Sequence, residues 1–358
     1  MPLTAAPAVE FSGTPLAASR DVGSLVAQFE RRAMGSPLRL TLVGQRPAVA
    51  EHAWRIVVDE FEASEQAMSR FRGSSGATLV NRAAGTGLAL TVDRRLMRAL
   101  VAADRAGRLT EGRFDARVLA VLERLGYVGA DPDGADLGSA GIESPGSATA
   151  PGPVAESGTE RWLVAAPRAG TVAVHCPVDL GGIGKGLALR WAWRAVERSG
   201  ILDTRTPTAA NPIGFLLEAG GDLVARGWSG AGAPWSIGIE DPTGGMDPLA
   251  VIAVSDGAVV TSSITVNRWQ TATGRIVHHL IDPQTGEPGG EGLLAVSVAG
   301  PDPAWAEVWS KTLFLAGAGG ITGLARSRGL AAWWAYEDGQ LEMTAAARAQ
   351  TVWVAGER

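Results

Sequence analysis

Alternating apolar and polar positions predict that this chain forms a sheet of short strands. Residues 37–43 (PLRLTLV) place leucine at every second position, which is the period of a strand with one buried face. Comparable apolar segments follow at residues 162–166, 171–175, 215–218, 235–239, 249–254 and 295–299. We therefore expect one sheet to be assembled mainly from these strands.

Apolar residues at helical spacing predict helices between the strands. In residues 48–71, Trp54, Phe61 and Met68 share one helical face. Further helices are expected over residues 94–109, from about residue 116, from residue 185 to a C-cap at Gly200, and around residues 306–314. Helices and strands mix without strict alternation. The pattern therefore favours an α+β fold, with a mostly antiparallel sheet and flanking helices.

Length and composition define the folded part. The chain has 358 residues, of which 46% are hydrophobic, so one large unit with a sizeable core can form. We expect residues 1–28 to be a weakly ordered leader and residues 29–358 to form that unit. Residues 129–160 are rich in Gly, Pro, Ser and Asp and have no apolar period, which predicts a flexible surface insertion.

Charge and cysteine content exclude several classes of protein. Lys and Arg total 32 against 37 Asp and Glu, a net charge of -5, so charge gives no argument for nucleic-acid binding. The single cysteine, Cys176, excludes an internal disulfide and a cysteine-based zinc site. Long uncharged apolar runs and a signal-like start are both lacking. We therefore expect no membrane span and a cytoplasmic location.

The segment 178–186 (VDLGGIGKG) joins a glycine-rich turn to the predicted start of a helix. Glycines let a backbone approach a ligand closely, and the first helical turn offers N–H groups and a positive dipole end to an anion. Lys185 adds a full charge, so a phosphate or diphosphate fits. The segment is not a P-loop, because no Ser or Thr follows the lysine. A plain turn that packs a helix on a sheet is the alternative.

The segment 278–286 (HHLIDPQTG) holds two of the four histidines of the chain. His279 and Asp282 could share the work of a general base at a strand end. The alternative is structural: a strand, HHLI, that runs into an Asp-Pro turn closed by Gly286. Both interpretations stay open for this segment alone.

Three shorter segments are weak indications of function when each is taken alone. VTSS, residues 260–263, places hydroxyls after an apolar strand, where they could bind phosphate oxygens. EAGGD, residues 218–222, is a strand ending in a glycine turn, which could make room for a flat ligand or form a hairpin. Glu307 and Lys311 lie four residues apart on one face of a predicted helix. Taken alone, they are also explained by an ordinary exposed ion pair.

In their order along the chain, these segments resemble the ApbE family of FAD:protein FMN transferases. The resemblance extends from Met34 to about Gly317. It is carried by residues 34–36, 68–71, 79–81 and 112–115, followed by VDLGGIGKG, EAGGD, VTSS and HHLIDPQTG. Each piece is weak, but their joint order is specific.

The resemblance implies an α+β flavin-transferase fold of T-shaped outline, and a reaction. The FMN half of FAD moves to a Thr or Ser hydroxyl of a partner flavoprotein, and AMP leaves. Such a transfer needs positioning, charge neutralisation and a base near the attacking hydroxyl. Two alternatives stay open: a FAD-binding protein with a degenerate metal site and little turnover, and a diphosphatase that cuts FAD into FMN and AMP.

The matched motifs also imply roles for individual residues. His279 and Asp282 match the reaction-centre pair, as base and orienting group. Positions that match the FAD site are Met34, Phe71, Arg113, Phe114, Asp115, Asp179, Lys185, Thr261, Ser262 and Leu280. Phe71 stands where family members often have Tyr, so a hydroxyl contact is lost while the ring contact can remain. Ser263 replaces the glycine of a TSG element.

The magnesium site that the resemblance implies is altered. Family members hold Mg²⁺ with a backbone carbonyl, here that of Gly182, and with an aspartate and a threonine where this chain has Glu307 and Lys311. A protonated lysine cannot bind Mg²⁺. Either the Lys311 ammonium substitutes for the ion, or the site has decayed.

Overall fold

The computed structural model describes residues 26–127, 161–202, 213–229 and 232–357. The predicted insertion at residues 129–160 lies outside this part of the chain, as do residues 1–25 of the predicted leader. Strand β1 begins at Val26, so residues 26–28 of the predicted leader belong to the sheet instead.

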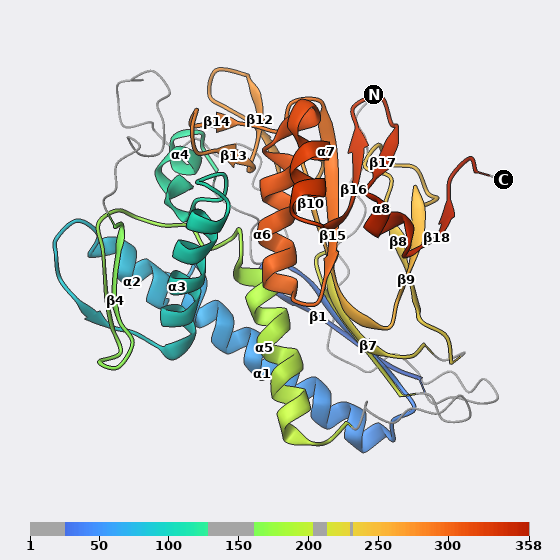
Figure 1. Cartoon of the computed structure of the whole chain (residues 1–358). Helices are drawn as coiled ribbons and strands as arrows, with labels where there is room; N and C mark the ends of the chain where they lie inside the picture. The colour runs from blue at the N-terminus through green and yellow to red at the C-terminus, as the bar shows by residue number, and fades with distance from the viewer. Residues whose placement is uncertain (1–25, 128–160, 203–212, 230–231, 358) are drawn as a thin grey trace, which may run out of the picture.

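A sheet of eight strands forms the centre of the molecule (Figure 1). Every neighbouring pair in it is antiparallel. In spatial order the strands are β1 (Val26–Ala33), β2 (Ser36–Val43), β6 (Gly214–Ala219), β7 (Asp222–Gly227), β10 (Asp256–Ser263), β15 (Leu293–Gly300), β16 (Ala331–Tyr336) and β17 (Leu341–Met343). The predicted α+β class with a mostly antiparallel sheet is confirmed.

Three long helices cover one face of this sheet: α1 (Pro47–Met68), α5 (Gly184–Ser199) and α6 (Pro303–Phe314). Leu38, Leu40 and Leu42 of β2 point into the core beneath α1 and α5, as the alternation of this strand predicts. The other helical elements are α2 (Gly76–Arg82), α3 (Arg94–Leu109), η1 (Ala116–Val118), α4 (Leu119–Arg124), α7 (Gly317–Ser327) and α8 (Ala345–Arg348).

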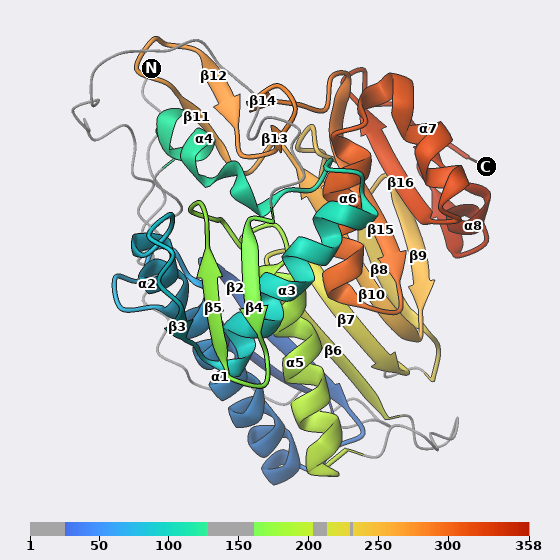
Figure 2. The ribbon, with the colours of Figure 1, turned by 60° about the vertical axis from the view of Figure 1, so that its left-hand side comes forward.

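Smaller sheets complete the fold (Figure 2). Strands β8 (Trp235–Ile239), β9 (Ala250–Val254) and β18 (Thr351–Val354) form one sheet, which packs on the face of the central sheet away from α5. Another is made of β3 (Leu90–Thr91), β5 (Thr171–Val174) and β4 (Leu163–Ala166). Two hairpins join β11 (Arg268–Gln270) to β12 (Ile276–His278), and β13 (Ile281–Asp282) to β14 (Glu287–Pro288).

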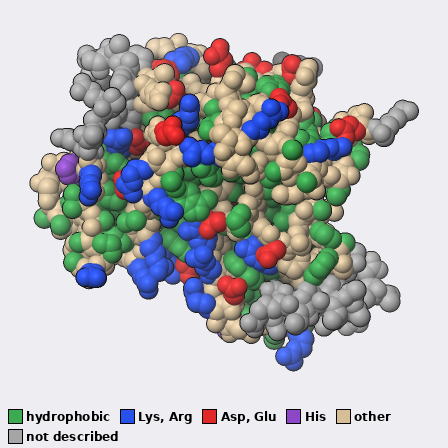
Figure 3. All heavy atoms as spheres, in the orientation of Figure 1, with side chains coloured by type: hydrophobic (Ala, Val, Ile, Leu, Met, Phe, Trp, Pro, Cys, Tyr) green, Lys and Arg blue, Asp and Glu red, His purple; other side chains and the backbone are tan. Residues whose placement is uncertain are grey.

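Basic side chains gather on the face that carries α3 and α5 (Figure 3). Burial lowers the pKa of Arg98, and the neighbouring charges of Arg94, Arg198 and Arg194 lower it further. In the described part of the chain, no helix has both the length and the apolar composition needed to cross a membrane.

Candidate functional site

The glycine-rich segment predicted from the sequence leads directly into α5. Close packing requires a glycine at position 186. A Cβ on Gly186 would lie 2.6 Å from the Cα of Ala304 and 2.6 Å from the carbonyl oxygen of Pro303, so the first turns of α5 and α6 touch through their backbones. A Cβ on Gly184 would lie 3.7 Å from the Cε of Met34. The segment therefore meets α6 and the β1–β2 turn together.

Lys185, in the first turn of α5, forms an ion pair with Asp222. Its Nζ lies 2.7 Å from Oδ2 of that carboxylate, whose side chain is 1% exposed. Burial acts to lower the pKa of Lys185, but Asp222 and Glu307 outweigh it and leave the pKa raised. The lysine therefore stays charged. The nearby Gly220 adopts φ 61°, the left-handed backbone that favours glycine.

Glu307 and Lys311 form a second pair, on α6. Lys311 Nζ lies 3.2 Å from Oε1 of Glu307, which is completely buried, and the N–H of Gly186 donates to Oε2 at 2.8 Å. Burial raises the pKa of Glu307, while the Lys311 ammonium acts to lower it. A Cβ on Gly182 would lie 3.5 Å from Cδ of Lys311 and 2.8 Å from Cε2 of Phe114. This brings three predicted site residues together: Gly182, Phe114 and Lys311.

The hydroxyls of Thr261 and Ser262 on β10 both have partners. Thr261 Oγ1 shares a hydrogen bond of 2.8 Å with Ser297 Oγ, and the Thr261 N–H donates to Oδ1 of Asp222. Ser262 Oγ shares a bond of 2.7 Å with Ser310 Oγ on α6. The two residues therefore tie β10 to Asp222 and to α6.

His279 follows β12 and has a buried Nδ1 atom, which has no hydrogen-bond partner within the described residues. Burial lowers the pKa of His279 to about 3, and the charges of Lys311, His278 and Lys185 add to this effect. The imidazole is therefore neutral at pH 7 and lies within electrostatic reach of both lysines.

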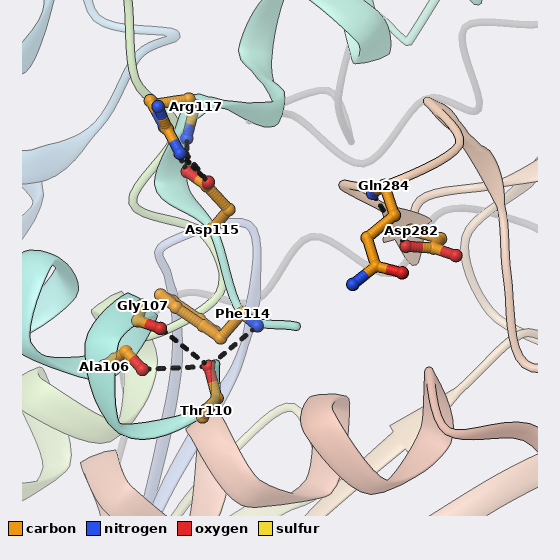
Figure 4. Close-up of polar contacts among 8 residues, drawn as sticks. All are labelled: Ala106, Gly107, Thr110, Phe114, Asp115, Arg117, Asp282 and Gln284. Carbon is orange, nitrogen blue, oxygen red and sulfur yellow. Dashed lines mark hydrogen bonds and ion pairs between the residues drawn. The ribbon is translucent and has the colours of Figure 1, made fainter. Parts of the chain in front are cut away.

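Asp282 does not contact His279 directly. Its Oδ1 accepts the N–H of Gln284 at 2.9 Å and so holds the turn after β13 (Figure 4). Within the described chain, no hydrogen bond joins Asp282 to His279. Leu280, between them, packs in the core with Val260 and Phe314. The direct pairing that an orienting group would need is therefore not found in this structure.

The segment after α3 brings Phe114 into the core and leaves Arg113 exposed. Thr110 Oγ1 accepts the N–H of Phe114 at 3.0 Å and donates to the carbonyl of Ala106 (Figure 4). The carboxylate of Asp115 is occupied by Arg117, with Nη2–Oδ2 at 2.6 Å. Asp115 therefore acts on its own segment, as N-cap of η1 and partner of Arg117.

Asp179 lies beside a group of aromatic rings. Its Oδ2 is 2.6 Å from Nε of Arg70, whose guanidinium stacks over the rings of Phe71, at 4.3 Å, and Tyr127, at 5.0 Å. Trp269 packs on Tyr127 with ring centroids 4.8 Å apart. Phe71 is 49% exposed, so part of its ring remains accessible.

Asp222, Arg70 and Tyr127 contribute to this region but were not predicted as site residues. Asp222 and Arg70 belong to segments noted in the sequence, EAGGD and residues 68–71. Their ion pairs with Lys185 and Asp179 depend on long-range folding. Tyr127 stands next to the Gly-rich segment and carries no local signal.

The residues at the implied magnesium position do not fit a cation. Both oxygens of Glu307 are already engaged, by an ammonium and by an N–H. Unit charges of like sign 4 Å apart repel by about 4 kcal/mol near a protein surface, and a divalent ion doubles this. Within the residues that the structure describes, no three His, Cys, Asp or Glu side chains gather as metal ligands.

A pocket of about 320 Å³ lies elsewhere, between α5, β7 and the start of α6. Its walls include Arg190, Trp193, Arg226 and Asp256, and none of the predicted site residues. Arg226 and Asp256 pair with each other at 3.0 Å. The pocket is therefore distinct from the site around Lys185.

Fold and site together define an α+β protein with two lysine–carboxylate ion pairs, built where a glycine-rich loop starts a helix. Residues 34–334 match the ApbE family, and the chain belongs to that family.

Known proteins agree with this assignment. The FAD:protein FMN transferase of Klebsiella pneumoniae is 25% identical, over 88% of this chain and 86% of its own. The FAD:protein FMN transferase of Salmonella typhimurium is 25% identical, over 87% of this chain and 84% of its own. The ApbE protein of Thermotoga maritima has the same fold, with a TM-score of 0.73 and 22% identity over 91% of this chain and 99% of its own. The flavinyl transferase ApbE of Pseudomonas stutzeri has a TM-score of 0.69 and 20% sequence identity, over 93% of this chain and 100% of its own.

Proposed function

We propose that this protein is a FAD:protein FMN transferase. It moves FMN from FAD to a Thr or Ser hydroxyl of a partner flavoprotein and releases AMP. Membership of the ApbE family and the names of its relatives support this activity. The cytoplasmic location expected from the sequence stays a prediction.

The proposed reaction is a substitution at phosphorus. The acceptor oxygen attacks the phosphorus atom that carries the riboflavin half and forms a new P–O bond. The bond from that phosphorus to the bridging oxygen breaks, and AMP leaves with the bridging oxygen and its electron pair. The hydroxyl proton passes to a base. Charge on the diphosphate must be neutralised throughout.

Lys185 and Lys311 are the groups we assign to the diphosphate. Each ammonium has three N–H donors, of which the ion pair with Asp222 or Glu307 uses one. The glycines before α5 allow a close approach of the ligand to the backbone. No step in this proposal runs through a magnesium ion, because Glu307 and Lys311 do not fit one.

His279 is the base in this proposal, and its buried, unpartnered Nδ1 atom is the observation that supports this assignment. A neutral imidazole with a buried, unpartnered Nδ1 atom, within electrostatic reach of two lysines, can accept the proton of an attacking hydroxyl once bound diphosphate offsets the lysine charges that lower its pKa. Asp282 holds the turn beyond it through the N–H of Gln284. We therefore assign Asp282 a positioning role.

The remaining predicted residues are proposed to line the FAD site. Phe71, whose ring is half-exposed, is placed against the flat isoalloxazine, next to Asp179 and Arg70. The other members are Met34, Arg113, Phe114, Asp115, Thr261, Ser262 and Leu280. Of these, Asp115, Thr261 and Ser262 have protein partners already, so we expect them to shape the site.

The test is incubation of the purified protein with FAD and an acceptor domain that bears a target threonine. Flavin fluorescence that stays on the acceptor after denaturing electrophoresis, with AMP released in equal amount, supports the proposal. A matched acceptor with alanine in place of the threonine should stay unlabelled. Intact FAD at the end of the incubation would indicate a binding protein without turnover. Free FMN with AMP would indicate a diphosphatase.

A further inference from the structure

The chain contains only two lysines, and both lie in the proposed active site. Lys and Arg together number 32, and all of them except these two lysines are arginines. Arginine also serves in the tightly packed pair of Arg70 with Asp179. The two exceptions, Lys185 and Lys311, each pair with a buried carboxylate. Lysine carries a compact charge with three freely turning donors, whereas arginine presents a wide planar fork.

The position of Lys311 is fixed from several sides. Glu307, four residues earlier on α6, is completely buried and holds the ammonium at 3.2 Å. The same carboxylate accepts the N–H of Gly186, which anchors it to the start of α5. The carbon stem passes the glycine-rich loop at Gly182. The side chain of Lys311 is 15% exposed, so the charge is held at the loop and still reaches solvent or ligand.

We propose that the ammonium of Lys311 takes the place of a divalent cation in this protein, so that FMN transfer proceeds without Mg²⁺. This inference rests on the proposed function. The ammonium donates to the diphosphate and offsets the negative charge that develops as AMP leaves, while Glu307 fixes its position. Lys185 provides the second positive charge, from the α5 side of the same site.

The first experiment uses the wild-type protein. After dialysis against EDTA, transfer to the acceptor domain is measured in EDTA and in MgCl₂, and we expect rates within about twofold of each other. Calorimetric titration of MgCl₂ into the FAD-saturated protein should give no stoichiometric binding. A one-to-one binding isotherm, or stimulation of about tenfold or more by Mg²⁺, overturns the inference.

The second experiment removes the charge. Lys311→Met keeps an unbranched stem, and we expect it to weaken FAD binding roughly 10- to 100-fold, the value of a charge-assisted hydrogen bond. Arg326→Met is the matched control, since it removes one positive charge from the exposed surface of α7 and should bind FAD as wild type does. Equal affinity in Lys311→Met and wild type contradicts the inference.

The third experiment restores oxygen ligands. The double variant Lys311→Thr/Glu307→Asp supplies a hydroxyl and a shorter carboxylate, and we expect its FAD affinity to become dependent on Mg²⁺. If it stays independent of Mg²⁺, the ammonium does not occupy a cation position and the inference fails.

The outcomes separate this inference from the proposed function. Failure of wild type to bind FAD, or to label the acceptor under any condition, refutes the proposed function itself. Transfer that requires Mg²⁺ leaves the proposed function standing and refutes only the role of Lys311. The wild-type measurements need no variant, so poor folding of a mutant cannot hide the answer.

Discussion

The protonation of His279 is controlled by its burial and by charges on three other residues. Burial disfavours the imidazolium, and Lys311, His278 and Lys185 disfavour it further, so the pKa of His279 falls to about 3. As the proposed base, His279 is therefore weak in the free protein. Binding of the negatively charged diphosphate beside the lysines would raise this pKa. The ligand would therefore strengthen its own base.

We predict that His279→Gln lowers the transfer rate by roughly 100-fold or more, because a positioned base is lost. FAD affinity, measured by calorimetry, should change little, since the neutral imidazole carries no charge to the diphosphate. In wild type, kcat/KM should show no acid limb from His279 between about pH 5 and pH 7. In Lys311→Met, loss of a positive charge raises the pKa of His279 and should move the acid limb upward. An unchanged transfer rate in His279→Gln would rule out this residue as the base.

We also predict a clear coupling between Arg70 and Asp179. Arg70→Met leaves the Asp179 carboxylate, 11% exposed, without its countercharge, and should cost about 3 kcal/mol or more of unfolding free energy. The double variant Arg70→Met/Asp179→Asn should recover part of this loss. Urea denaturation followed by tryptophan fluorescence compares four proteins: wild type, Arg70→Met, Asp179→Asn and the double variant. Additive losses in the double variant would mean that the two residues do not interact energetically.

Site residues could be predicted from the sequence only where a motif contains them. Lys185 and Glu307 could be proposed as site residues because they stand in recognisable segments. The partnership of Lys185 with Asp222 joins residues from α5 and β7, which only the folded sheet brings together. The opposite failure concerns Asp282, whose spacing from His279 suggested contact. A turn amide, that of Gln284, occupies its carboxylate instead.

The contact between α5 and α6 is the element on which the site depends. Asp302 caps α6 by accepting the N–H of Ala304 at 3.0 Å, and it also pairs with Arg190 of α5. Glu307 reaches back to the N–H of Gly186. The two helix starts are thus joined at several points around the two lysines, which sets the distance between their charges.

We predict that Gly186→Ala separates these helices. Its Cβ would meet the backbone of Ala304 and Pro303, which cannot turn away as a side chain can. Overpacking of this kind costs about 1–3 kcal/mol, and FAD affinity should fall because the lysines move apart. Gly319→Ala in α7 is the control, with nothing within 4 Å of the added Cβ, and should gain about 0.5–1 kcal/mol of unfolding free energy. Thermal unfolding and calorimetry with FAD report both effects; wild-type stability in Gly186→Ala would contradict the close backbone contact.

Secondary-structure elements were predictable where one face is buried and the pattern is regular. Helix α3 has the predicted bounds, residues 94–109, and β8 agrees with the prediction of 235–239. Strand β1 was missed because VAQFERRA is polar and gains its hydrogen bonds at the sheet edge from β2. Strand β16 (AAWWAY) was missed because both its faces are covered, which removes the alternation.

At the level of the whole molecule, the central sheet separates two cores and positions the site. Alternate residues of the sheet point to the helices on one face and to β8, β9 and β18 on the other. The hairpin of β11 and β12 ends at His278, whose ring lies edge-on to that of Phe314 in α6, with ring centroids 6.0 Å apart, and His279 follows it. These histidines become buried only when the chain folds, so the unfolding free energy of the protein depends on pH.

We predict that acid destabilises the protein partly through His278 and His279. Their pKa values in the folded protein are about 4 and about 3, lowered first by burial and, for His278, then by Arg268. The unfolded chain binds protons on both below about pH 6.5, and the folded chain does not. The unfolding free energy therefore falls as the pH drops below about 6.5, and it keeps falling until the pH passes the pKa values of the folded protein. For His279 alone, the loss at pH 4 is about 3 kcal/mol. Urea denaturation at several pH values measures how the unfolding free energy depends on pH, and this dependence should be flatter in His278→Gln/His279→Gln than in wild type. The control is His52→Gln, at an exposed position on α1, which should keep the pH dependence of wild type. Parallel slopes in the double variant and wild type would mean that these histidines are as accessible to protons in the folded protein as in the unfolded chain.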